Sequence, residues 1–211
     1  SNLSHAELEK IANIVRQHPN LYIMSDEIYK DILYTDSHNS IAAMPGMSER
    51  TIILDGFSKS YAMTGWRLGY GIMPSELVPH ITRLAVNSVS CAASFSQIAA
   101  VAALDGPQDD VEAMVTEFAI RRTLISEGLR SIANINCPEP EGAFYAFPSI
   151  KNLGLTSSEF EDRSLREAGV ALLAGNAFGE FGEGYVRLSY ANSQENIQKA
   201  IERLDKFVRS L

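Results

Sequence analysis

The alternation of short apolar runs with amphipathic helices is the feature that most restricts how this chain can fold. Apolar runs lie at residues 21–24, 51–54 and 68–72. Helical spacing of apolar residues precedes the first run and recurs at 75–85 and 95–104. Runs of this length are typical of buried strands in a parallel sheet. Strands that alternate with helices predict an α/β fold with a mostly parallel sheet.

The pattern changes near Gly106, where longer polar helices and shorter strand candidates begin. This change predicts a second, smaller α/β unit, with a domain boundary between residues 108 and 109. Its expected helices lie at 109–131, 160–168 and 194–208, and its expected strands at 132–136, 144–147, 170–173 and 185–190.

Composition excludes several classes of function. The net charge of −8 argues against nucleic acid as the main partner, because phosphate binding needs a basic surface. No apolar run approaches the length of about 20 residues that crosses a bilayer, and the N-terminus shows no signal-peptide pattern. Cys91 and Cys137 lack metal-ligand spacing, so we expect two reduced thiols, no metal site and a cytoplasmic protein.

An acid and a tyrosine follow the first apolar run. Ligands of open α/β sheets bind beyond the carboxyl ends of the strands, so Asp26 is well placed to face a ligand. It can equally cap the turn that follows. Tyr29 shares the same site if the segment turns helically, and otherwise packs as an ordinary aromatic residue.

Three further charged residues stand out. Lys59 follows the run at 51–54, and Arg67 lies at the edge of the run at 68–72. Alone, such residues are solvated charges or members of surface ion pairs, although the planar donors of arginine also suit a phosphate or a carboxylate. Arg187 lies in the middle of an alternating strand pattern, where it is either exposed or bound to an anion.

Residues 56–69, with the sequence GFSKSYAMTGWRLG, resemble the lysine signature of class I/II aminotransferases, the aspartate aminotransferase family. Three other segments resemble motifs of that family, in the same order along the chain. They are DEIY at 26–29, EGAFY at 141–145 and VRLSYA at 186–191. The resemblance implies the pyridoxal-phosphate-dependent transferase fold type I, with part of the large cofactor-binding domain at 1–108 and the small C-terminal domain at 109–211.

The resemblance also implies pyridoxal 5'-phosphate as the cofactor. Lys59 would hold it as a Schiff base and move a proton to and from the substrate α-carbon. Asp26 would bind the ring nitrogen, and Tyr29 would bind the phenolate oxygen. Arg67 would bind the phosphate, and Ser58 would either bind it too or satisfy backbone groups in the turn.

Substrate contacts follow from the resemblance in the C-terminal segment. Arg187 would bind the substrate α-carboxylate. Phe144 would line the substrate pocket or pack in the core. Gly175 and Gly179 resemble a family turn in which Ala174 replaces the usual proline, which should loosen that turn without changing the chemistry.

The implied activity is transfer of an amino group between an L-amino acid and a 2-oxo acid, of the aspartate, aromatic or alanine type. The matching motifs belong to the C-terminal half of the family, so we expect the chain alone to bind the cofactor poorly and to be weak or inactive. A homodimer is expected from the family. Phe57, Tyr61, Met63 and Trp66 are the expected source of apolar surface for self-association.

Other functions remain open at this point. The same scaffold supports pyridoxal-phosphate-dependent lyases, because a fold does not determine a reaction. Aminotransferase-like domains also serve as effector-sensing parts of regulators, and the chain could be a stable piece without a function of its own. A Ser/Lys hydrolase built on Ser58 and Lys59 is disfavoured, because adjacent residues of an extended chain point to opposite faces.

Overall fold

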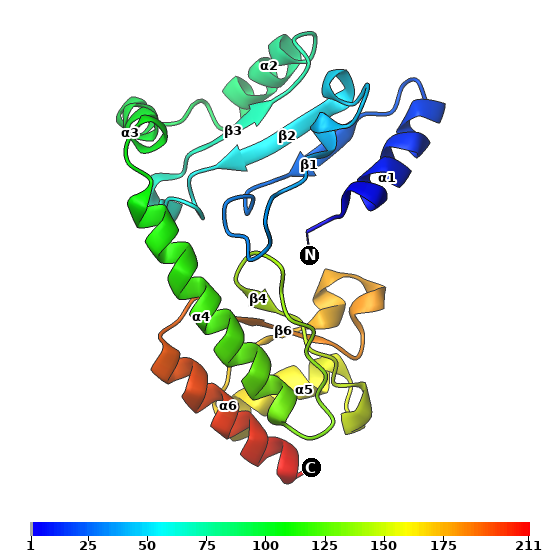
Figure 1. Ribbon diagram of the computed structural model, residues 1–211, viewed down its shortest axis with the longest axis vertical. Helices are drawn as coiled ribbons and strands as arrows, with labels where there is room; N and C mark the ends of the chain where they lie inside the picture. The colour runs from blue at the N-terminus through cyan, green and yellow to red at the C-terminus, as the bar shows by residue number, and fades with distance from the viewer. Residues whose placement is uncertain (1) are drawn as a thin grey trace. The chain divides into compact units, whose positions relative to one another are not determined.

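The computed structural model describes residues 2–211 and divides into two compact units, the first ending at Glu112 and the second comprising Ala113–Leu211. Helix α4 (Asp109–Ser131) begins in the first unit and continues into the second (Figure 1). Each unit combines helices with a three-stranded sheet, which confirms the α/β class.

The sheet of the first unit is mixed. Strands β1 and β2 are parallel, with Asp26 opposite Leu54. Strands β2 and β3 are antiparallel, with Gly56 opposite Gly69. The prediction of a mostly parallel sheet is therefore corrected here, because the described residues 57–68 contain no crossover α-helix and an antiparallel partner needs none. The strands are β1 (Ile23–Asp26), β2 (Thr51–Gly56) and β3 (Gly69–Ile72).

The first strand begins later than its apolar run and is less buried than expected. Leu21 and Tyr22 precede the strand and are exposed. Within β1 exposed and half-buried residues alternate, and Met24 keeps 67% of its surface accessible. The run is thus apolar without lying in a core that covers both faces of the sheet.

Helix α1 (His5–Gln17) forms as the sequence predicts. The Ser4 side chain accepts a hydrogen bond from the Glu7 amide, and the Glu7 carboxylate accepts one from the Ser4 amide. This capping box satisfies amides that a helix start would otherwise leave unpaired. The buried face of α1 packs on a short segment before β2, and the cluster comprises Leu8, Ala12, Val15, Ile41, Met44 and Met47.

Two further helices follow β3, namely α2 (Val78–Ser88) and α3 (Ser94–Asp105). Ala100 of α3 is buried against Phe57 and Leu68, which lie at the two ends of the loop that carries Lys59. Helix α3 therefore supports the loop between β2 and β3.

The second unit has a fully antiparallel sheet in the order β4–β6–β5. The expected strand at 132–136 is reduced to a single bridge between Asn136 and Ser149. The expected helix at 160–168 begins earlier and ends as a π-helical turn. The elements are β4 (Tyr145–Ala146), β5 (Leu173–Ala174), β6 (Val186–Ser189), α5 (Ser157–Arg163) and α6 (Gln194–Arg209).

The terminal helix α6 packs along the later part of α4 (Figure 1). A Cβ on Gly128 of α4 would lie 2.2 Å from the Cδ1 atom of Ile201 in α6, so the missing side chain permits this close approach. Ser193 caps α6, and its buried face contains Ile197, Leu204, Phe207 and Val208. Within residues 2–211, none of the helices combines the length and apolar character needed to cross a membrane.

Candidate active site

The structure brings Lys59 and Tyr29 together at one edge of the first sheet. Because β1 and β2 are parallel, the segments that leave their carboxyl ends emerge on the same side. Tyr29 lies in the turn after β1, where the Lys30 amide donates to the Glu27 carbonyl. The Nζ atom of Lys59 lies 5.7 Å from the centre of the Tyr29 ring, within the range of a cation–π contact.

Lys59 lies on a tight loop that is closed by glycines and anchored by buried side chains. At its base, a Cβ on Gly56 would come within 2.9 Å of the Gly69 Cα, so the two strands approach more closely than a side chain permits. Ala62 and Arg67 adopt left-handed backbone conformations, with φ of 52° and 53°. Residues other than glycine rarely hold such angles unless the surroundings enforce them.

Asp26 ends β1 and is exposed. Its Oδ1 atom accepts a hydrogen bond of 3.3 Å from the Ile28 amide, so the turn-capping role considered from the sequence is present. That contact uses one carboxylate oxygen and leaves acceptor capacity for a ligand. Asp26 forms no ion pair with any described residue.

Arg67 is exposed, and its Nη1 atom donates to the Thr64 carbonyl at 2.9 Å. It lines an open groove whose other walls include Trp66, Phe95 and the free thiol Cys91. Lys59 is not among the residues that line this groove, so the groove does not itself unite the two predicted residues. Ser58 is half-buried in the turn beside Lys59.

Arg187 lies in the second unit and is held by aromatic rings. Its Cζ atom lies 4.2 Å from the centre of the Phe178 ring and 4.5 Å from that of Tyr145. The side chain is half-buried and forms no ion pair within residues 2–211. A guanidinium with this setting keeps its planar donors available for an external carboxylate.

The other residues predicted for the site in the second unit take part in packing and in a tight turn. Phe144 stacks on Phe118 of α4, with ring centres 5.2 Å apart, which favours a packing role. Gly175 starts a 3₁₀ turn that Gly179 ends with a φ of 117°. A Cβ on Gly175 would lie 2.2 Å from the Gly182 carbonyl oxygen, so close backbone packing requires the glycine.

Sequence reasoning missed a buried carboxylate beside the lysine loop. Asp55 lies near the end of β2, and only 3% of its side chain is exposed. Its Oδ2 atom accepts hydrogen bonds of 2.6 Å from Lys30 Nζ and from the Tyr70 hydroxyl. We call these three residues the Asp55 cluster. Like Asp26, Asp55 is an acid at the carboxyl end of an apolar run, and this position is a signal that was already present in the sequence.

A second buried acid, Glu27, is satisfied in the same region. It accepts hydrogen bonds from Ser25 and Ser40 at 3.0 and 2.7 Å, and His38 Nε2 lies 2.9 Å from its other oxygen. This network attaches the segment around residue 40 to the end of β1.

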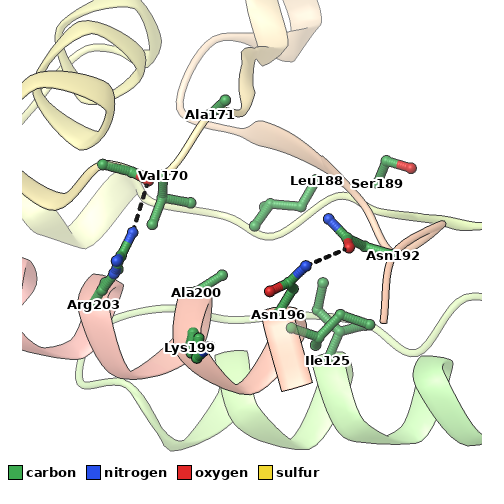
Figure 2. A pocket seen from close by; sticks show the side chains of 12 residues that line it. Ile125, Val170, Ala171, Leu188, Ser189, Asn192, Asn196, Lys199, Ala200 and Arg203 are labelled. Atoms are coloured by element: carbon green, nitrogen blue, oxygen red, sulfur yellow. Dashed lines mark hydrogen bonds between the residues drawn. The ribbon is translucent and has the colours of Figure 1, made fainter. Parts of the chain in front are cut away.

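Figure 2 shows a pocket in the second unit that is distinct from the predicted residues. Leu188 lines it, and strand alternation directs the neighbouring Arg187 to the opposite face of β6. Its two cations are already engaged, because Arg203 donates to the Gly169 carbonyl and Lys199 pairs with Glu195. The pocket therefore offers no free charge that would mark it as the site.

The first unit carries several chemical groups that suit pyridoxal phosphate. Asp26 is an acceptor for a ring N–H, and Tyr29 offers a phenol beside the primary amine of Lys59. Arg67 is an exposed guanidinium without an acidic partner among the described residues. The residues present thus fit the cofactor. No cluster of three His, Cys, Asp or Glu side chains suited to a metal occurs in the described chain.

The fold and this edge define an α/β protein with a lysine beyond the carboxyl ends of parallel strands, and comparison with known proteins identifies its family. The family described as aminotransferase class I and II matches residues 1–204. The chain therefore belongs to the class I and II aminotransferase family.

Individual relatives support the same assignment. An aspartate aminotransferase of Pyrococcus abyssi is 43% identical over 212 residues, which cover 99% of this chain and 54% of the relative. An aromatic-amino-acid aminotransferase of Thermococcus litoralis is 41% identical over 210 residues, covering 98% of this chain and 54% of the relative. The crystal structure of an aromatic aminotransferase from Pyrococcus horikoshii superposes with a TM-score of 0.95 at 42% identity, covering 99% of this chain and 56% of that one. The chain thus spans about half the length of these relatives.

Proposed function

We propose that this chain carries the lysine and the substrate arginine of a pyridoxal-phosphate-dependent aminotransferase. The observation that carries the proposal is the placement of the Lys59 amine over the Tyr29 ring at the carboxyl edge of β1 and β2. That edge is where ligands of α/β sheets bind. Membership of the family supports the assignment of the reaction class.

Each residue has a defined task in this proposal. When bound, pyridoxal phosphate supplies an electron-poor ring that withdraws charge from the substrate α-carbon. Lys59 provides the amine that anchors the cofactor and then takes and returns the α-carbon proton. Asp26 stabilises a proton on the ring nitrogen, and Tyr29 donates a hydrogen bond from its phenol. Arg67 binds the phosphate through charge-assisted hydrogen bonds.

Arg187 binds the α-carboxylate of the amino acid or 2-oxo acid. Its two flanking rings restrict the guanidinium, so less rotamer freedom is lost when a carboxylate binds. Relatives of similar identity are described as aspartate and aromatic-amino-acid aminotransferases. We propose an amino acid of one of these classes as the amino donor, in a cytoplasmic enzyme.

Covalent labelling tests the central claim. The chain is treated with pyridoxal phosphate and then with borohydride, and the modified lysine is located by peptide mapping. Label concentrated at Lys59 is the expected result. Lys151 is a suitable internal comparison, because its Nζ atom also lies over a tyrosine ring, that of Tyr185, at 4.7 Å. Equal labelling of Lys59 and Lys151 would contradict the proposal.

An assay of amino transfer tests the proposed reaction. Because the chain spans about half the length of its relatives, we expect amino transfer by the chain alone to be weak or absent. Transfer from aspartate or an aromatic amino acid to a 2-oxo acid, lost in Lys59→Ala, would identify the reaction in any longer protein that contains this chain. Efficient transfer by the 211-residue chain would show that it needs no further part.

We also propose that the chain self-associates. Of the residues expected from the sequence, Trp66 is exposed, with 46% of its surface accessible, whereas Phe57 is buried in the first unit and Tyr61 and Met63 pack against it. Helices α2 and α3 also carry exposed apolar side chains, with Leu84 64% and Ile98 72% accessible. Patches of this kind commonly mark interaction sites. Sedimentation that shows only monomer at high concentration would overturn this proposal.

A further inference from the structure

The Asp55 cluster connects two segments that carry residues of the proposed site. Asp55 immediately precedes Gly56, where the Lys59 loop begins, and its Oδ1 atom accepts a hydrogen bond of 2.7 Å from the Gly56 amide. Lys30 immediately follows Tyr29 in the turn after β1. A single carboxylate therefore links the turn of Tyr29 to the start of the loop of Lys59.

Tyr70, the third residue of the cluster, attaches the Asp55 carboxylate to strand β3. Tyr70 pairs with Asp55 in the antiparallel register of β2 and β3, and its hydroxyl reaches Asp55 Oδ2. The centre of the Tyr70 ring also lies 5.7 Å from that of the Phe57 ring. Phe57 is the buried residue that anchors the start of the Lys59 loop. The cluster thus joins strands β2 and β3 to the turn that follows β1.

Because the Asp55 carboxylate is buried, it is stable only while all its hydrogen-bond and salt-bridge partners are in place. A carboxylate that is almost fully shielded from water is costly unless charged or hydrogen-bonded partners compensate it. The three donors at 2.6, 2.6 and 2.7 Å provide that compensation. Lys30 also contacts Asp31 at 3.2 Å, so its ammonium is held between two acids. Movement of the Tyr29 turn away from the loop would therefore leave Asp55 without its charged partner.

We propose that Asp55, through its salt bridge to Lys30, is a positioning residue that holds Tyr29 beside the Lys59 amine. The proposal rests on the proposed function, in which Tyr29 and Lys59 act on the same cofactor. It assigns no contact of Asp55 with cofactor or substrate. Tyr70 supports the carboxylate but does not form the link between the two segments.

The first test measures the placement itself. The Tyr29 ring is observed by nuclear magnetic resonance in the chain with isotope-labelled tyrosine, and its signals are assigned with Tyr29→Phe. In the wild-type chain, Lys59→Met should shift the Tyr29 signals, because the amine lies over the ring. In the double variant Lys30→Met/Asp55→Asn, Lys59→Met should no longer shift them. The double variant removes both charges together, so neither charge is left buried without a partner.

The second test measures the consequence for Lys59. Labelling by pyridoxal phosphate and borohydride should be roughly tenfold slower at Lys59 in the double variant, because small displacements of paired groups have large effects on rate. Tyr70→Phe is the matched control, since it removes one hydrogen bond and keeps the salt bridge. It should slow labelling much less than the double variant does, because the salt bridge between the two segments stays in place.

The outcomes separate this inference from the proposed function. Label scattered over many lysines in the wild-type chain counts against the function, while the resonance experiment still decides the placement. A Tyr29 signal that responds to Lys59→Met equally in the wild type and the double variant would overturn the inference. So would equal slowing by Tyr70→Phe and the double variant, which would indicate general loosening rather than a specific link.

Discussion

The two units differ in how completely they bury their own helices. Helix α6 of the second unit buries four side chains along one face, among them Leu204. Helix α2 of the first unit, described throughout its length, buries none, although Ile81, Leu84 and Val86 are apolar. The second unit therefore closes its own core, whereas the first leaves apolar faces that need another surface to cover them.

The units also hold their key cations by different means. Lys59 lies on a loop that is attached through hydrogen bonds and a salt bridge around Asp55. Arg187 lies in a strand and is flanked by the rings of Tyr145 and Phe178. The first arrangement is held by a buried carboxylate and its donors, and the second by contacts between a guanidinium and aromatic rings.

The largest expected effect comes from a matched pair of leucines. Leu204→Ala in α6 should lower the free energy of unfolding by about 3 kcal/mol, because it leaves a cavity at a residue that is 1% exposed. Leu84→Ala in α2, at 64% exposure, should change it by about 0.5 kcal/mol or less. Chemical denaturation at low protein concentration measures both. Equal losses would show that α2 is covered in solution, and the comparison would fail.

A glycine substitution tests backbone packing in the second unit. A Cβ at Gly182 would lie 2.0 Å from the Gly175 carbonyl oxygen, a backbone atom that cannot turn aside as a flexible side chain can. Gly182→Ala should therefore cost about 2 kcal/mol, as expected for overpacking. Gly65→Ala in the first unit has open space around the new methyl group and serves as the control. A thermal midpoint unchanged by Gly182→Ala would contradict the close packing.

The aromatic support of Arg187 should be measurable as a coupling energy. A double-mutant cycle of Arg187→Met and Phe178→Leu should give about 0.5–1 kcal/mol, because Phe178 is partly exposed and the cation–π contact is correspondingly modest. The unfolding free energies of the four proteins provide this value. A coupling energy of zero would mean that the Phe178 ring shields the Arg187 guanidinium from water without attracting it.

The smallest effect concerns alkaline pH. Burial, and then the hydrogen bond to Asp55, raise the pKa of Tyr70 to about 12. A raised pKa in the folded state adds stability below the pKa of about 10 of an unfolded tyrosine, and this stability disappears as the pH rises through about 12. The free energy of unfolding should therefore fall across this interval, and it should fall less in Tyr70→Phe.

A control for this prediction uses the absorbance of ionised tyrosine. Asp55→Asn removes the negative charge next to Tyr70, so Tyr70 should ionise at lower pH than in the wild-type chain. Identical absorbance titrations of the wild type and Asp55→Asn would show that the carboxylate does not influence the hydroxyl.

Local signals in the sequence predicted local structure well. The bounds of α4 agree with the predicted 109–131, and the helix expected before the first apolar run forms as α1. These features depend on residues a few positions apart. The direction of β3 and the exposure of Met24 were not predicted, because they depend on which distant segment lies beside each strand.

The same distinction applies to the candidate site. The position of Asp26 at a strand end and the motif around Lys59 both indicated the carboxyl edge of the first sheet, where Tyr29 lies beside Lys59. The link from Lys30 to Asp55 joins residues 25 positions apart, and no local pattern indicates it. Of the two rings beside Arg187, that of Tyr145 belongs to β4 and that of Phe178 to a 3₁₀ turn, so their convergence also needed three-dimensional information.

The two thiols of the chain should differ in their reactivity toward alkylating reagents. Burial raises the pKa of Cys137 to about 11, so this thiol should react slowly with alkylating dyes. Cys91 is exposed and lines the same groove as Arg67. A fluorophore should therefore attach to Cys91 without any mutation, and its emission would report phosphate esters that approach Arg67. The sequence thus already provides one thiol at which a dye can be placed beside the proposed binding site of the cofactor phosphate.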